Sequence, residues 1–227
     1  MPDAAASKEL EQIADAAAEV VNCIRVLEKS GSNLVAEVLG GHDFIAYDHY
    51  PPDDVYDPQS HAQYYFHAHP PDRGPRSNYG HFHTFLGSAA ISDQVSAVSG
   101  LPQKAAPAHL IAISMSREGR PVGLFTTNLW VTAEPWCCAD DLIGKLDRFV
   151  IDLAKPSWPL NRWISAMLVL YRHEISSLIR ARDARIAAWQ QTHPDTNAVD
   201  DRRLEVTSGH PIDLDLKLAE IRTALGL

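Results

Sequence analysis

Two short runs of sequence decide the expected fold: Tyr64-Tyr65-Phe66-His67-Ala68-His69 and Gly80-His81-Phe82-His83-Thr84-Phe85. Both runs place histidine at every second position among aromatic or small residues, which is the two-residue period of a β-strand. The ten residues between the runs, 70–79, are rich in Pro, Gly, Asp and Ser, which favour turns. We therefore predict an antiparallel hairpin that carries two His-x-His triplets.

The two triplets predict a metal site. Alternate side chains share a face of a strand, so His67 and His69 lie together, and so do His81 and His83. If His69 lies opposite His81, then His67 lies opposite His83, with cross-strand Cβ atoms about 5 Å apart. Four imidazoles would then form a rectangle the size of a first coordination shell. The alternative is a polar network of histidines that holds no ligand.

The composition is that of an ordinary globular protein. The chain has 227 residues, of which 45% are hydrophobic and 22% are charged, within the range of one large domain. We predict a single α+β domain over residues 1–227, with a small antiparallel sheet packed by N- and C-terminal helices. A helical N-terminal layer covers 1–41, the His-rich sheet covers 60–135, and a helical part covers 139–227.

Apolar spacing locates the elements of the N-terminal half. A helical period runs over about 7–28, and Asn33 is placed to cap a short helix over 34–39. Residues 42–60 lose any period and are interpreted as an irregular loop. A second hairpin is predicted from 109–115 and 122–128, with Gly119 in its turn.

The C-terminal part is expected to be mainly helical. Asp140 can cap a helix that ends before Pro156, and one long helix then runs from Ser157 to about Gln190. An apolar stripe over 159–190 favours a core position, although its length allows a homodimer seam. The segment 203–218 fits a strand or a helix, and the pattern leaves both open.

Further residues can complete the predicted site. His109 begins a strand, and Glu134 is a candidate carboxylate; both are second choices as metal ligands after the four histidines. Aromatic and amide side chains in the strand region are expected to line a pocket: Tyr64, Phe66, Phe82, Phe85, Asn128 and Trp130.

Charge and cysteine content limit the other functions. A net charge of −9 argues against general nucleic-acid binding, which needs a positive field. No stretch reaches the roughly 20 apolar residues of a membrane span. Three cysteines form no disulfide framework, so we expect a cytoplasmic protein in a reducing compartment; the role of the adjacent Cys137 and Cys138 stays open.

The central runs carry a resemblance to a known family. The segments YYFHAH, GHFHTFLG, HLIAISM and GRPVGLFTTNLWVT are similar to those of a bacterial family of unknown function, best over about residues 60–135. The resemblance implies no activity. Cupins and histidine-triad hydrolases are weaker matches, because the downstream glutamate of the first and the third alternating histidine of the second are missing.

These observations favour a metalloenzyme with a mononuclear His-rich site that acts on a small-molecule substrate. Imidazole ligands suit iron, zinc, copper or nickel, and redox chemistry is narrowly preferred to hydrolysis because no general base is evident. The alternatives are a metal or haem carrier or sensor, and a structural protein with a histidine network. The sequence leaves open the metal, the substrate, the oligomeric state and whether the site is open or closed.

Overall fold

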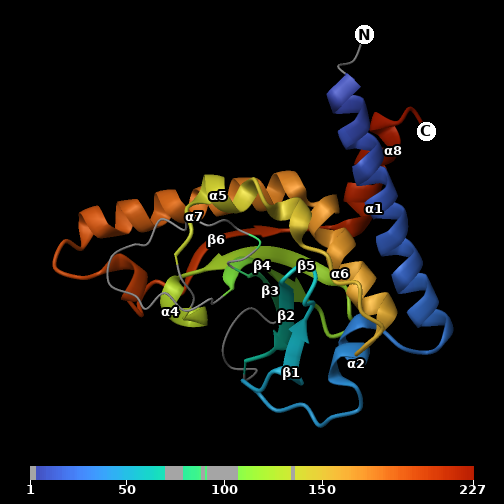
Figure 1. Ribbon diagram of the computed structural model, residues 1–227, viewed down its shortest axis with the longest axis horizontal. Coiled ribbons are helices and arrows are strands. Elements are labelled where there is room, and N and C mark those ends of the chain that lie inside the picture. The colour runs from blue at the N-terminus through green and yellow to red at the C-terminus, as the bar shows by residue number, and fades with distance from the viewer. Residues whose placement is uncertain (1–3, 70–78, 88–89, 91–106, 134–135) are drawn as a thin grey trace.

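A six-stranded antiparallel sheet forms the centre of the protein in a computed structural model, which describes residues 4–69, 79–87, 90, 107–133 and 136–227. Each strand pairs with its neighbour in sequence, so the order is β1-β2-β3-β4-β5-β6 (Figure 1). The strands are β1 (Tyr50–Tyr56), β2 (Ala62–His67), β3 (Gly80–Leu86), β4 (Ala108–Met115), β5 (Pro121–Thr127) and β6 (Val206–Pro211). The predicted α+β class is confirmed.

Helices from both ends of the chain pack with this sheet. The N-terminal part forms α1 (Ala4–Lys29) and α2 (Leu34–Leu39); the C-terminal part forms α6 (Trp158–Leu170), α7 (Arg172–Thr192) and α8 (Leu214–Ala224). Short elements connect them, namely α4 (Leu129–Thr132), α5 (Ala139–Ile143), and two 3-10 turns, η1 (Leu146–Arg148) and η2 (Ala198–Asp200). In Figure 1 α7 runs along the sheet, whereas α1 and α8 lie together at one end. None of the described helices has the length and apolarity of a membrane span.

One face of β2 and β3 builds the apolar core with α6. Phe82 lies between Phe66 and Trp163, with ring centroids 5.0 and 5.6 Å away. Tyr64 is fully buried on the same face and donates a 2.6 Å hydrogen bond from its hydroxyl to Oδ1 of Asn161 on α6. Full burial of one large apolar side chain contributes about 1.5–3 kcal/mol, so this face supplies a large share of the stability.

Several local predictions are confirmed. The Asn33 side chain accepts hydrogen bonds from the backbone N–H groups of Val35 and Ala36, and α2 ends at Gly40 in the left-handed conformation. The helix predicted over 7–28 is α1, and the second predicted hairpin is β4 and β5. These features depend on neighbours in sequence, which is why the sequence alone locates them.

Three element predictions were wrong. The helix expected from Asp140 to before Pro156 is only the short α5, whose N-cap is Cys138 and not Asp140, followed by the 3-10 turn η1. Residues 50–56 form the edge strand β1 and not a loop; its register shifts between Tyr50 and Val55, which hides the two-residue period. The long C-terminal helix divides at Tyr171, whose φ and ψ of −106° and 23° leave the helical region. No Pro or Gly marks this break. The break allows α6 to pack on α1 while α7 packs on β6.

Two further segments complete the comparison with the sequence. The open segment 203–218 contains the strand β6 followed by the start of α8. The apolar stripe of α6 and α7 is buried within the chain itself, as Leu160, Ile164, Ile175 and Ile179 show. A short helix expected within 92–98 lies outside the described residues.

Candidate metal centre

The histidines occupy the opposite face of β2 and β3 from the aromatic core. His67 pairs with His81, and Tyr65 pairs with His83. The predicted register, which placed His69 opposite His81, was therefore wrong by two residues. A shift of two residues keeps every side chain on its face, whereas a shift of one would reverse the faces. His67, His81 and His83 consequently share a face as expected, while His69 lies beyond the end of β2.

Packing on the core face explains the observed register. Phe66 pairs with Phe82, and the Phe66 ring lies directly over Gly80, where a Cβ atom would overlap it. Only glycine leaves this space. The aromatic side therefore sets the pairing that brings the imidazoles together on the other side.

Three histidines converge on one point. One nitrogen from each of His67, His81 and His83 lies within 4.8 Å of the other two. The Nε2 atoms of His67 and His81 are 2.8 Å apart. The ring centroid of His67 is 4.5 Å from that of His81 and 5.0 Å from that of His83, and the last two are 4.8 Å apart. We call these three residues the histidine triad.

These separations match the geometry of ligands on one metal ion. Imidazoles whose nitrogens bind a metal at about 2.1 Å have ring centroids about 4.5 Å apart at a 90° ligand angle and about 5.2 Å apart at a tetrahedral angle. All three centroid distances in the triad lie within this range. The ring spacing of the triad is therefore compatible with a shared metal ion.

Burial keeps the triad neutral. His81 and His83 are 5% and 1% exposed, and His67 is half-buried. Burial lowers the pKa of His67 to about 4, with a smaller contribution from the positive charges of His69 and His49. Burial, with a smaller contribution from neighbouring histidines, also brings the pKa of His81 and of His83 well below the usual value. Neutral imidazole is the form that binds metals, so all three side chains are ready as ligands at pH 7.

Two ring nitrogens of the triad have no partner among the described residues. They are Nδ1 of His81 and Nε2 of His83, both buried. Buried polar atoms are nearly always hydrogen-bonded, and an exception needs an explanation such as a bound ion or water. A ligand to a metal is one such explanation for Nε2 of His83.

His109 lies behind the triad and not within its group of three nitrogens. Its Nε2 atom is 3.0 Å from Nδ1 of His83, and both side chains are buried. Burial lowers the pKa of His109 to about 3, with a further contribution from the positive charge of Arg182. The structure thus brings His109 to the site, but through a hydrogen bond to one member of the triad.

Two more histidines flank the triad. The ring of His69 is 5.2 and 5.4 Å from those of His67 and His81. The His49 ring lies 5.9 Å from that of His67 and stacks on Tyr65 at 3.7 Å. Asp54 accepts a 2.9 Å hydrogen bond from Nδ1 of His49, so that Nε2 of His49 has a lone pair whenever the ring is neutral.

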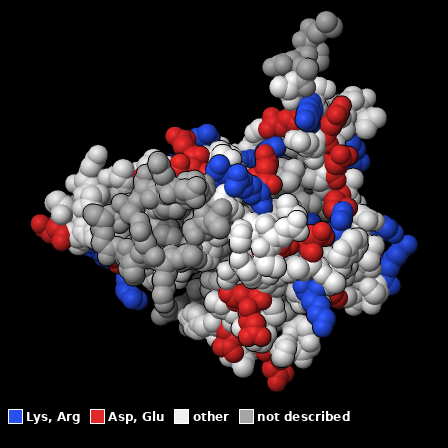
Figure 2. All heavy atoms as spheres, in the orientation of Figure 1, with Lys and Arg blue, Asp and Glu red and all other residues white. Residues whose placement is uncertain are grey.

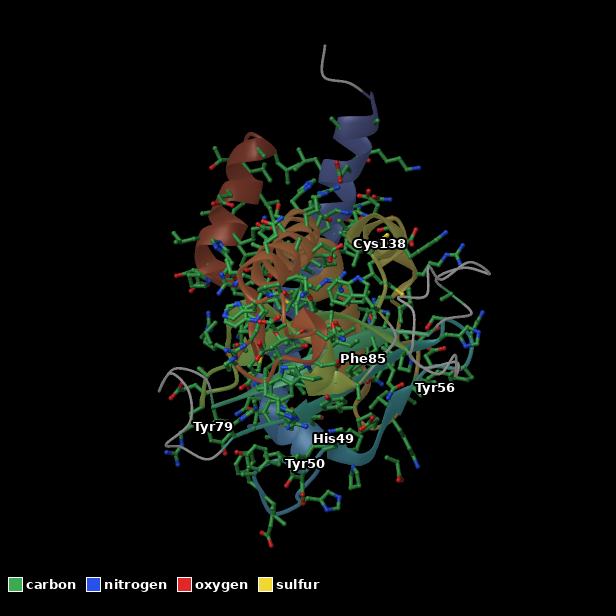
Figure 3. All side chains as sticks on the ribbon, turned by 90° about the vertical axis from the view of Figure 1, so that its left-hand side faces the viewer. His49, Tyr50, Tyr56, Tyr79, Phe85 and Cys138 are labelled. Atoms are coloured by element: carbon green, nitrogen blue, oxygen red, sulfur yellow. The ribbon has the colours of Figure 1, made fainter. Side chains whose placement is uncertain are left out.

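His49 is exposed at the surface beside the triad. It lines a hollow of about 490 Å³ with His42, Asp43, Asp48 and Tyr50 among its other residues. Figure 3 shows His49 and Tyr50 next to each other in the lower part of the molecule, and Phe85 above them. In Figure 2 acidic side chains gather on the lower part of the visible face, where Figure 1 places β1. Negative charge attracts cations, so this side suits the approach of a metal ion.

Aromatic side chains surround the triad on its own face. The ring centroid of Tyr65 is 5.1 Å from that of His83, and the Phe85 ring lies 5.5 Å from Tyr65. The Phe125 ring, from β5, contacts His81 at 5.1 Å. Of the predicted pocket residues, Phe85 therefore lies beside the histidines.

The other predicted pocket residues lie elsewhere. Tyr64, Phe66 and Phe82 are on the core face, because they alternate with the histidines. Asn128 caps α4 and donates to the carbonyl oxygen of Ala198; Trp130 donates through Nε1 to the carbonyl oxygen of Leu204. Glu134 lies outside the described residues. Cys138 lies far above His49 in Figure 3, so it is no part of this site.

The sequence interpretation missed the positions of His49 and Asp54, but not that of Tyr65. The position of Tyr65 was available from the strand period, since it alternates with Phe66 just as His67 does. His49 and Asp54 could not be placed, because the bulge in β1 brings them to the site from a segment without a period.

The fold and the site together define the class of protein: an α+β domain with a buried histidine triad that could hold a metal ion. The family follows from a comparison with family models. Residues 14–212 match the model of a domain of unknown function, DUF6969, and the chain belongs to this family. Searches of curated proteins and of solved structures gave no match.

Proposed function

We propose that this protein is a metalloenzyme. It binds one transition-metal ion through His67, His81 and His83 and uses this ion in catalysis. The observation that carries the proposal is that three neutral imidazoles on one face of the sheet bring their nitrogens within 4.8 Å of one another. A donor set of three imidazoles suits zinc, copper, iron or nickel. It does not suit magnesium or calcium, which prefer oxygen ligands.

The arrangement of the triad supports an open site. If all three rings bound one ion, their centroid distances would correspond to ligand angles within about 90–109°, and the rings would lie on one side of the ion. His69 lies nearby but outside the group of three nitrogens. A site with three protein ligands keeps a position for water or substrate, as catalytic zinc sites do, whereas structural sites are closed.

The surroundings of the triad support small-molecule chemistry. Tyr65, Phe85 and Phe125 make its face partly apolar, and His49 with Asp54 forms a histidine–carboxylate pair at its margin. A metal held by three imidazoles supplies Lewis-acid or, with iron or copper, redox chemistry. The preference for redox chemistry depended on the lack of a general base. His49 is a candidate for that role, so hydrolysis fits the site equally well.

A histidine network without a ligand is the second candidate. The hydrogen bonds between His67 and His81 and between His83 and His109 favour it, because they satisfy four ring nitrogens without any ion. The two candidates differ in one measurable property. Only the metal site binds an ion stoichiometrically.

The test is elemental analysis of protein purified without a tag, before and after incubation with zinc or cobalt. We expect about one ion per chain in the wild type and none in the double variant His67→Ala, His83→Ala. The matched control is His42→Ala, His173→Ala, which removes two exposed histidines outside the triad. An equally loaded triad variant, or a wild type that takes up no metal, would overturn the proposal.

A second measurement tests the open position. In cobalt-substituted protein, azide or cyanide should change the visible absorption spectrum, and His69→Ala should keep most of the metal. If neither anion changes the spectrum and His69→Ala strips the metal as completely as His81→Ala, the site is a closed shell of four histidines. The protein would then be a metal carrier or sensor.

A further inference from the structure

A β-bulge brings His109 to the histidine face. Thr84 pairs with Ile111, yet the next residue, Phe85, pairs with His109, so Leu110 has no partner on β3. In a regular strand His109 would share the core face with Ile111. The extra residue turns it to the other face, which is the effect of bulges beside functional sites.

The side chain of Thr84 fixes this bulge. Its hydroxyl donates a 2.7 Å hydrogen bond to the carbonyl oxygen of Ile111 and accepts one of 3.3 Å from the N–H of the same residue. Thr84 is fully buried, so these bonds are shielded from water. The position of His109 is therefore built into the sheet and does not depend on a mobile side chain.

The contact between His109 and His83 couples the tautomers of the two rings. Nε2 of His83 faces no described hydrogen-bond partner, and Nδ1 lies 3.0 Å from Nε2 of His109. A neutral imidazole has one N–H donor and one acceptor. If Nε2 of His109 accepts, the proton of His83 stays on Nδ1, and Nε2 of His83 presents its lone pair to the triad.

We infer that His109 is a positioning residue, which orients His83 and holds it in the tautomer that binds a transition-metal ion, and is not itself a ligand. The inference rests on the proposed metal site and adds the residue that prepares it. Histidine ligands generally donate their second N–H to a carboxylate, a backbone carbonyl or water, and loss of that partner weakens metal affinity by about 10–100-fold. Here the partner is a second histidine, fixed by a bulge.

The tautomer can be measured without any metal. Long-range proton–nitrogen NMR spectra of the metal-free wild type should show His83 protonated on Nδ1. In His109→Phe, which keeps an aromatic ring but removes the acceptor, the proton of His83 should move wholly or partly to Nε2. His83 protonated on Nε2 in the wild type would overturn the inference, whatever the variants do.

Metal affinity gives a second, independent measurement. With zinc as the probe, His109→Phe should weaken binding by about 10–100-fold. His109→Gln retains a side-chain acceptor and should stay within a few-fold of the wild type. His81→Ala, which removes a member of the triad, should abolish binding. Wild-type affinity in His109→Phe, or complete loss in both His109 variants, would contradict a positioning role.

The controls distinguish a positioning role of His109 from a purely structural role and from failure of the proposed metal site. Urea unfolding of each metal-free variant shows whether it folds, and a purely structural role would lower stability while leaving the affinity of the folded protein unchanged. Failure of the proposed function would appear as a wild type without zinc binding. Failure of the inference alone would appear as a zinc-binding wild type whose affinity does not respond to His109→Phe.

Discussion

The two faces of the β2–β3 hairpin are made by alternate residues of the same two strands, yet they differ in almost every property. The core face carries Phe66 and Phe82 against Trp163 of α6. The other face carries the histidine triad, with nitrogens that approach within 4.8 Å. The comparison shows that strand pleating lets one hairpin separate the residues that stabilise the fold from those that prepare a site.

The faces also differ in energy. Each aromatic side chain on the core face gains about 1.5–3 kcal/mol by leaving water. On the histidine face, burial of a polar ring costs free energy unless its nitrogens are paired. The bonds of His81 to His67 and of His83 to His109 offset part of this cost, while Nδ1 of His81 and Nε2 of His83 lack described partners. Such a face contributes less to stability than the core face does.

The largest expected effect comes from the core face. Phe82→Ala should lower the free energy of unfolding by about 3–5 kcal/mol, because it leaves a cavity between Phe66 and Trp163. Urea denaturation of the metal-free protein measures this loss. Val26→Ala, at a residue 40% exposed on α1, is the control and should stay within about 0.5 kcal/mol. A small effect of Phe82→Ala would mean that the two faces do not differ in the way described here.

A smaller effect is expected from pH on the histidine face. His67 has a pKa of about 4 in the folded protein and about 6.5 when unfolded, so below pH 6.5 the unfolded chain binds more protons. Stability is therefore present above pH 6.5 and is lost as the pH falls toward 4. His67 alone should contribute roughly 2 kcal/mol of this loss between pH 7 and pH 5.

Unfolding of the metal-free protein at pH 7, 6 and 5 measures the pH effect. The variant His67→Phe, His81→Phe removes two titrating rings and should flatten the pH dependence. His42→Ala, His173→Ala serves again as the matched control and should keep the slope of the wild type. A triad variant with an unchanged slope would place the acid-sensitive groups elsewhere.

The smallest expected effect comes from Thr84. Its side chain lies on the core face, but its hydrogen bonds fix the bulge that places His109 on the histidine face. Thr84→Val keeps the side-chain volume and removes the hydroxyl that bonds Ile111. We expect a loss of about 1 kcal/mol in stability and a weaker zinc affinity, because His109 is no longer held against His83. Thr207→Val, on β6, is a control with a similarly buried hydroxyl. Zinc affinity unchanged in Thr84→Val would show that the bulge holds without this side chain.

Features that depend on near neighbours in sequence were predicted well. The helix over 34–39 follows from Asn33 at its start and Gly40 at its end, and the second hairpin follows from alternation around Gly119. The long C-terminal helix shows the limit of such patterns. Its apolar period continues through Tyr171, although the chain leaves the helical conformation there to satisfy two different packing surfaces.

For the candidate site, the sequence by itself determined which side chains share a face. A strand alternates its side chains with a period of two, so His67, His81 and His83 lie on one face in any register that keeps the aromatic residues in the core. That rule is local and needs no knowledge of the fold. It is why a shift of two residues in the pairing left the prediction of a histidine cluster intact.

Only the tertiary structure decided which histidines meet. The contact of Phe66 with Gly80 selected the register that pairs His67 with His81. The bulge at Leu110 turned the side chain of His109 to the histidine face of the sheet. The bulge in β1 brought His49 to the margin of the site. Each of these depends on packing between segments distant in sequence, and an irregular residue in a strand reverses the face of everything beyond it.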